Sequence, residues 1–205
     1  THKLLAAFSQ GSMIHVKDGR KRVDHGRFNE AYMMHMSTSP QYAIIASLDV
    51  AAKMMAGNAG RFLIDETIQE AIIFRKKMKH LKKEIELKET ERKRRWWLEI
   101  WQPEKVSIET EDGKRETFDL EDIDESILKD RPDCWYLKAN EDWHGFGKLE
   151  NDYVLLDPVK VTVMTPGITR QGRMRNWGIP ATIVTTFLRD RGIVVEKSGH
   201  YSFLI

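Results

Sequence analysis

The sequence has 205 residues and a mass of 23.9 kDa, the size of one ordinary domain. Its 41% hydrophobic and 31% charged residues are typical of a globular chain and exclude a disordered or fibrous one. Lys and Arg outnumber Asp and Glu by only 33 to 31, whereas a nucleic-acid-binding protein usually has a large basic excess, so we expect no nucleic-acid partner.

Several other classes of protein are also disfavoured. The mean hydropathy is −0.50 and no apolar run is long enough to cross a membrane, so no membrane partner is expected. The single cysteine, Cys134, excludes a disulfide framework within the chain and is typical of a reducing compartment, here the cytoplasm. The seven histidines lack metal-binding spacing, and we expect no metal site.

The two ends of the sequence predict a piece of a larger domain. Thr1 leads at once into an apolar helical pattern, and the chain stops in a run, Tyr201–Ile205, that indicates a strand in mid-course. Domains usually end in loops or polar tails instead.

The first sixty residues favour helices. Leu4–Ile14 has the apolar spacing of a short buried helix, and the charged stretch Val16–Arg27 predicts an exposed loop. Helices are expected over Arg27–Met36 and Gln41–Ala56.

Two short segments are expected to mark the ends of these helices. Ser37-Thr38-Ser39-Pro40 should stop the first helix and cap the second, because a serine hydroxyl satisfies free N–H groups and proline tolerates the first turn. The cluster Gly57-Asn58-Ala59-Gly60 is a helix breaker and the best candidate for a domain boundary.

The longest helical pattern runs from Arg61 to about Arg95. Between Arg75 and Arg95 it holds eleven Lys or Arg residues mixed with four glutamates. Such alternation usually forms a solvated face with ion pairs between residues i and i+4. The alternative is an RNA-binding helix, which a steep salt dependence of binding would reveal.

The second half of the chain favours strands. Trp97–Trp101 alternates like a strand, and Asp112-Gly113 predicts a hairpin turn. Asp119–Asp133 is acidic and is expected to be a surface excursion, with Cys134 after it as a packed or half-exposed thiol.

The C-terminal third predicts strand, turn, helix and strand in succession. The runs that carry it are Val159–Met164, a helix at Pro180–Arg191 ended by Gly192, and strands at Ile193–Glu196 and Tyr201–Ile205. This order is typical of the α/β class.

Lys3 is the residue with the most suggestive chemistry. It lies at the edge of the apolar stretch Leu4-Leu5-Ala6-Ala7-Phe8, and desolvation lowers the pKa of a lysine and frees its amine. Such a lysine can form a Schiff base with a carbonyl cofactor. By spacing alone, a lysine that simply reaches solvent from a helix start is favoured.

Blocks of residues along nearly the whole chain carry a resemblance to a known family. They include Thr1–Gln10, Phe28–His35, Ser37–Pro40, Trp143-His144-Gly145-Phe146, Leu156–Lys160, Thr165-Pro166-Gly167, Gly178–Ala181 and Gly192–Lys197. In this order they resemble the bacterial ornithine/lysine/arginine decarboxylases, which are pyridoxal 5'-phosphate (PLP) enzymes of the aspartate-aminotransferase fold, type I. Glu84–Arg95 and Glu109–Asp133 have no clear counterpart.

The resemblance implies a role for particular residues. Lys3 matches the lysine that forms the internal aldimine with PLP, and His2 matches a neighbour of the phosphate or the substrate. Ser37, Thr38 and Ser39 match a segment that reaches the phosphate of the partner subunit's cofactor; the alternative is that they only cap the following helix. Glu196 matches the carboxylate that receives the distal cation of the substrate, the alternative being a solvated glutamate at a strand end.

The resemblance also implies an organisation and an activity. Residues 1–57 match the end of the large PLP subdomain, and residues 58–205 match a smaller α/β subdomain truncated at its C-terminal end. The implied reaction is decarboxylation of lysine or arginine, or less readily ornithine, by a homodimer with shared active sites or a higher ring. Because it consumes a proton, acid resistance or polyamine synthesis is the expected biology.

The resemblance is incomplete at one point. The family's ring-stacking histidine, its pyridinium-pairing aspartate and most of its phosphate loop precede the lysine, so residues 1–205 alone are expected to be inactive. A non-catalytic relic or assembly subunit of the same fold is the alternative function.

Overall fold

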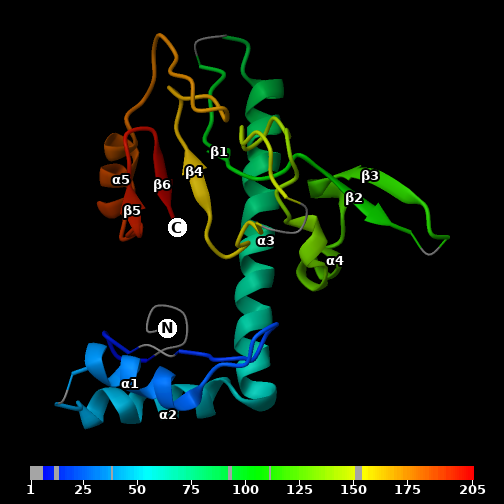
Figure 1. Cartoon of the computed structure of the whole chain (residues 1–205). Coiled ribbons are helices and arrows are strands. Elements are labelled where there is room, and N and C mark those ends of the chain that lie inside the picture. Colours follow the sequence, from blue (N-terminus) through cyan, green and yellow to red (C-terminus); the bar gives the residue numbers. More distant parts are fainter. Residues whose placement is uncertain (1–6, 12–13, 38, 92–93, 111, 151–153) are drawn as a thin grey trace. The chain divides into compact units, whose positions relative to one another are not determined.

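The structure is a computed structural model that describes residues 7–11, 14–37, 39–91, 94–110, 112–150 and 154–205 (Figure 1). The chain divides into two compact units, Thr1–Ile64 and Asp65–Ile205. One helix, α3 (Gly57–Lys88), runs through the boundary between them. The predicted subdomain division at residue 57 stays a prediction.

The first unit contains two of the predicted helices. They are α1 (His25–His35) and α2 (Tyr42–Met55), and both predictions are confirmed. The side chain of Asp24 caps α1 by accepting a hydrogen bond from the backbone of Arg27 at 2.9 Å. The described part of the predicted Leu4–Ile14 helix is not helical, because Gln10 adopts a left-handed backbone conformation with φ of 72°.

The predicted serine cap of α2 is wrong. The N-cap residue is Gln41, and it has no capping hydrogen bond from its side chain. Ser37 instead accepts a hydrogen bond at its Oγ from the backbone N–H of Ser39, at 3.1 Å. The serines therefore order their own turn and not the next helix.

The glycine cluster breaks the helices over a shorter distance than expected. Helix α2 ends at Met55 and α3 begins at Gly57, whose φ of 75° belongs to the left-handed region that glycine tolerates. The rest of the cluster is helical. At its other end α3 stops at Lys88, seven residues before the predicted end at Arg95.

The second unit contains two antiparallel sheets (Figure 1). The four-stranded sheet has the order β1-β4-β6-β5, and the other is the hairpin of β2 and β3, in which Gly113 (φ 72°) occupies the predicted turn. The strands are β1 (Glu99–Ile100), β2 (Lys105–Glu109), β3 (Arg115–Asp119), β4 (Thr162–Met164), β5 (Lys197–Ser198) and β6 (Ser202–Leu204). The predicted strand Ile193–Glu196 is wrong, because residues 193–195 lie outside the sheet and pairing with β6 begins at the backbone N–H of Glu196, just before β5.

Helices cover one face of the four-stranded sheet. Met78 of α3 and Ala181 of α5 (Ala181–Arg189) share a buried cluster with Val163 and Phe203 of β4 and β6. The helix predicted at Pro180–Arg191 is confirmed in position. The mixture of helices and sheets agrees with the α/β class, although strand pairing within each sheet is antiparallel.

A second core refutes the prediction that Asp119–Asp133 is a surface excursion. This segment forms η1 (Leu120–Asp122), α4 (Glu125–Asp130) and η2 (Pro132–Cys134), and it buries Leu120 and Leu128 completely. The charges misled the prediction because the apolar residues alternate with them and point inward. The buried hydrophobic cluster of this second core includes Ile72, Val106, Ile108, Leu120, Ile123, Leu128, Cys134, Trp135, Leu137, Trp143 and Leu156.

Among the helices described, none is long and apolar enough to span a membrane.

Candidate functional site

The predicted site residues fall in different parts of the structure. Lys3, His2 and Thr38 lie outside the described residues. Ser37 and Ser39 are exposed in the connection between α1 and α2, in the first unit. Glu196 belongs to the second unit.

Glu196 lies just before β5, next to β6, and its carboxylate forms an ion pair with a lysine ammonium. Its backbone N–H donates to the carbonyl of Leu204 at 2.8 Å, so it continues the pairing of β5 with β6. On the other side of β6, Val161 and Ile205 exchange two backbone hydrogen bonds of 3.0 Å. Lys160, just before Val161, extends its Nζ to Glu196 Oε2, and both side chains are about 40% exposed (41% and 42%).

The segment that ends at Lys160 is anchored by a buried arginine. Arg75 on α3 is fully buried, and its guanidinium donates to the carbonyls of Pro158 (2.9 Å) and Lys160 (3.0 Å). It also contacts the carbonyl of Asp157 at 3.4 Å. Burial lowers the pKa of Arg75 to about 10 against the opposing effect of the Asp157 carboxylate, so the guanidinium remains charged at neutral pH.

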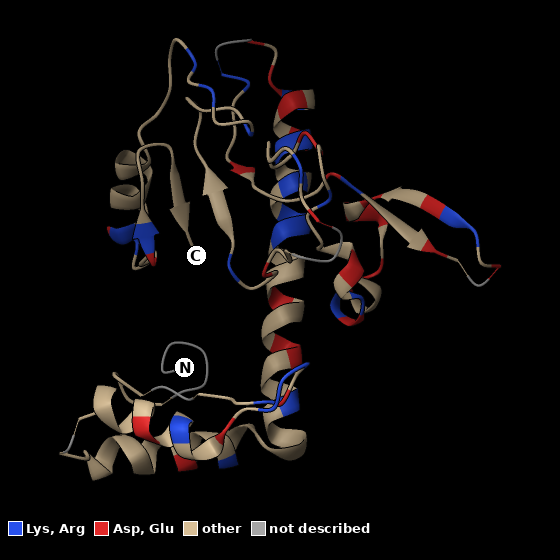
Figure 2. Ribbon diagram, in the orientation of Figure 1, with Lys and Arg blue, Asp and Glu red and all other residues tan. Residues whose placement is uncertain are grey.

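The basic stretch of α3 is therefore not the purely solvated face that its sequence predicts (Figure 2). Lys76 binds Glu125 at 2.6 Å, and Lys83 pairs with the buried Glu121. The expected i,i+4 pairing occurs between Glu84 and Lys88, at 3.0 Å. Within the described part of the helix, several cations thus face the segments that follow it and position them.

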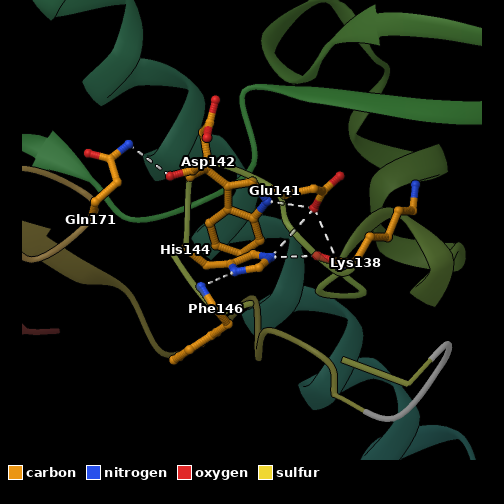
Figure 3. Close-up of polar contacts among 7 residues, drawn as sticks. Lys138, Glu141, Asp142, His144, Phe146 and Gln171 are labelled. Carbon is orange, nitrogen blue, oxygen red and sulfur yellow. Dashed lines mark hydrogen bonds and ion pairs between the residues drawn. The ribbon is translucent and has the colours of Figure 1, made fainter. Parts of the chain in front are cut away.

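The block Trp143-His144-Gly145-Phe146 forms a hydrogen-bonded turn in which Trp143 and His144 are buried (Figure 3). The side chain of His144 is 0% exposed. Its Nδ1 accepts the backbone N–H of Phe146 at 3.0 Å, so its Nε2 carries the proton and donates to the carbonyl of Lys138 at 2.9 Å. Trp143 Nε1 donates to Glu141 Oε2 at 2.9 Å. The block has a structural role here, because both ring nitrogens of His144 bind backbone groups and that of Trp143 binds Glu141.

A polar cleft of about 680 Å³ lies next to this turn. Gln171 crosses toward the turn and donates to the carbonyl of Asp142 at 3.0 Å (Figure 3). Arg170 in the cleft wall pairs with Glu99 (2.8 Å) and Glu104 (2.7 Å). Burial alone would raise the pKa of Glu99, but Arg170 and Lys82 lower it below its ordinary value. The positive charge of Arg170 is therefore paired with two carboxylates of the protein itself.

Cys134 is a buried free thiol, in agreement with the prediction of a packed side chain. It is 3% exposed, and burial together with the Asp133 carboxylate raises its pKa from 9.0 to about 11. At neutral pH the thiol is protonated, whereas the thiolate is the reactive form.

We expect Cys134 to resist alkylation in the folded protein at pH 8 and to react on unfolding in urea. Because the folded state holds the proton more tightly, the stability contributed by this thiol is complete below pH 9 and is lost as the pH rises toward 11. Iodoacetamide labelling with and without urea, followed by mass measurement, tests this. Equal labelling rates in the two states would contradict it.

Arg75, Lys160 and Arg170 are the residues that sequence reasoning missed. A buried arginine in a stretch that holds eleven Lys or Arg residues, residues 75–95, has no distinguishing signal. Lys160 belongs to one of the blocks that carry the resemblance, Leu156–Lys160, but its partner Glu196 lies 36 positions later. In the described residues, no group of three or more His, Cys, Asp or Glu is placed to hold a metal ion.

Comparison with known proteins identifies the family. The family model described as "Orn/Lys/Arg decarboxylase, major domain" matches residues 1–205. A lysine decarboxylase of Pseudomonas aeruginosa is 50% identical over 100% of this chain, and the biodegradative arginine decarboxylase of Escherichia coli is 41% identical, also over 100%. The chain spans 24% and 26% of these relatives, about a quarter of their length.

A solved structure agrees with the sequence match. Lysine decarboxylase A from Pseudomonas aeruginosa superposes with a TM-score of 0.73 and 50% identity, over 100% of this chain and 24% of that one. The predicted resemblance is thereby confirmed. The chain belongs to the Orn/Lys/Arg decarboxylase family.

Proposed function

We propose that this chain is part of a PLP-dependent decarboxylase whose substrate is lysine. The observation that carries the proposal is the match over the whole chain to decarboxylases of basic amino acids, with 50% identity to a lysine enzyme and 41% to an arginine enzyme. Glu196 has a part-exposed carboxylate that already pairs with one cation, the ammonium of Lys160, which supports a basic substrate at this position.

The cofactor is held by residues of the first unit. Lys3 is the residue that carries PLP, and His2 contacts its phosphate or the substrate. Ser37, Thr38 and Ser39 reach the phosphate of the cofactor that the partner subunit carries. Ser37 and Ser39 fit this role, because both are exposed, and Ser37 Oγ already accepts the N–H of Ser39, which leaves its O–H to donate to a phosphate oxygen. PLP, when bound, supplies the electron sink that lets the bond between Cα and the carboxylate break.

The remaining roles concern the substrate and the proton. Glu196 binds the distal ammonium of lysine in a charge-assisted pair and rejects neutral side chains. Lys3 or His2 returns a proton to Cα after CO2 leaves. The enzyme acts in the cytoplasm as a homodimer with shared active sites, and residues outside this chain complete the site.

The test is borohydride reduction of the protein purified from its source, followed by peptide mass mapping. Borohydride reduces the Schiff base to a stable bond. We expect a pyridoxyl adduct on Lys3 and loss of CO2 from added lysine by the unreduced protein. An unlabelled Lys3 in a protein of the relatives' full length would overturn the proposal in favour of a non-catalytic member of the family.

A further inference from the structure

Two facts about the Lys160–Glu196 pair bear on substrate binding. The pair joins segments on opposite sides of β6, and each backbone is fixed by hydrogen bonds, Val161 to Ile205 and Glu196 to Leu204. The side chains, in contrast, are about 40% exposed (41% and 42%), so the ammonium can leave the carboxylate for water without a buried charge being created.

The position of Lys160 is set independently of its ammonium. Arg75 donates to the carbonyl of Lys160 at 3.0 Å from the protein interior. Removing the Lys160 ammonium therefore leaves the main chain of both segments in place. The carboxylate of Glu196 would lose one cation and keep its location.

We propose that Lys160 is a specificity-determining residue that occupies the carboxylate of Glu196 until a substrate cation displaces it. The inference rests on the proposed role of Glu196. Lys160 presents the same primary ammonium as the distal end of lysine, so a substrate gains only the difference between its own ion pair and this internal one. The internal pair raises KM for a cationic substrate and leaves binding of a neutral analogue unchanged.

The size of the effect follows from the exposure of the pair. Exposed ion pairs stabilise by a small amount, which corresponds to about a two- to fivefold change in an equilibrium constant. Loss of a hydrogen bond to a charged group is larger, about tenfold or more. Removal of Lys160 and removal of the Glu196 charge therefore shift KM in opposite directions and by different amounts.

The experiment uses four variants of the holoenzyme in its full natural polypeptide: Lys160→Met, Glu196→Gln, the double variant and Lys197→Met. Lys197 is the matched control, because it is an exposed lysine next to Glu196 and the substitution makes the same change in net charge. Steady-state kinetics with lysine, and inhibition by norleucine as the neutral analogue, are measured for each.

We expect Lys160→Met to lower KM for lysine about two- to fivefold, with the inhibition constant of norleucine and the kinetics of Lys197→Met unchanged. The decrease should vanish when Lys160→Met is combined with Glu196→Gln. An unchanged or raised KM in Lys160→Met, while Glu196→Gln raises KM, overturns the role of Lys160 alone. If Glu196→Gln leaves KM unaltered, the proposed role of Glu196 fails, and the inference fails with it.

Discussion

Replacing Arg75 by methionine should lower the free energy of unfolding of the second unit by about 2–4 kcal/mol. The guanidinium is fully buried and donates to the carbonyls of Pro158 and Lys160 at 2.9 and 3.0 Å. Methionine fills much of the volume but donates no hydrogen bond, and each of the two part-buried carbonyls left without a donor costs about 1–2 kcal/mol.

Urea unfolding followed by tryptophan fluorescence measures this loss directly. All six tryptophans lie between residues 96 and 177, so the signal reports on the second unit. Lys77→Met is the control, because Lys77 is an exposed cation two positions along the same helix. Arg75→Lys should also be destabilised, since one ammonium cannot reach all the carbonyls. Equal midpoints for Arg75→Met and Lys77→Met would show that the buried network contributes nothing.

Replacing His144 by alanine should destabilise the same unit by about 2–4 kcal/mol. The imidazole is 0% exposed and serves two backbone groups, the N–H of Phe146 and the carbonyl of Lys138. Alanine removes the side-chain partner of both part-buried groups and opens a cavity beside the Trp143 ring, whose centroid is 4.8 Å from that of His144.

A second variant separates the two hydrogen bonds. In His144→Asn the side-chain oxygen occupies a position near that of Nδ1 and can accept the N–H of Phe146, while the donor to Lys138 is lost. We expect its stability to lie between those of the wild type and His144→Ala. Thermal unfolding by circular dichroism checks the order of the three proteins, and an Asn variant as unstable as the Ala variant would contradict the assigned ring orientation.

The elements with strong local signals were predictable from the sequence. Helices α1 and α2, the hairpin at Gly113 and the helix after Pro180 follow from periodicity and from turn chemistry, which act over a few residues. The family was predictable because its blocks of residues are spread along nearly the whole chain, and the match over residues 1–205 confirms it.

The missed features depend on residues far apart in the sequence. Asp119–Asp133 looks like a solvated acidic segment, and only its packing against Ile72 and Val106 shows that it is core. Arg75 looks like one of many surface cations, and only the carbonyls beyond residue 156 show that it is buried. Of the candidate site, Glu196 was singled out by resemblance, but its pairing with Lys160 required the register of β5 with β6. The roles of Lys3 and His2 stay predictions.

The buried position of Arg75 also has a consequence for the order of events during synthesis. Its carbonyl partners at Pro158 and Lys160 follow it by 83 and 85 residues. A ribosome that adds about 5–20 residues per second needs roughly 4–17 s to make that stretch. Throughout this interval the guanidinium of Arg75 lacks the carbonyls that it binds in the folded protein. Ile72 on the same helix can be covered sooner, because its cluster includes Val106 and Leu120, which are synthesised before Pro158.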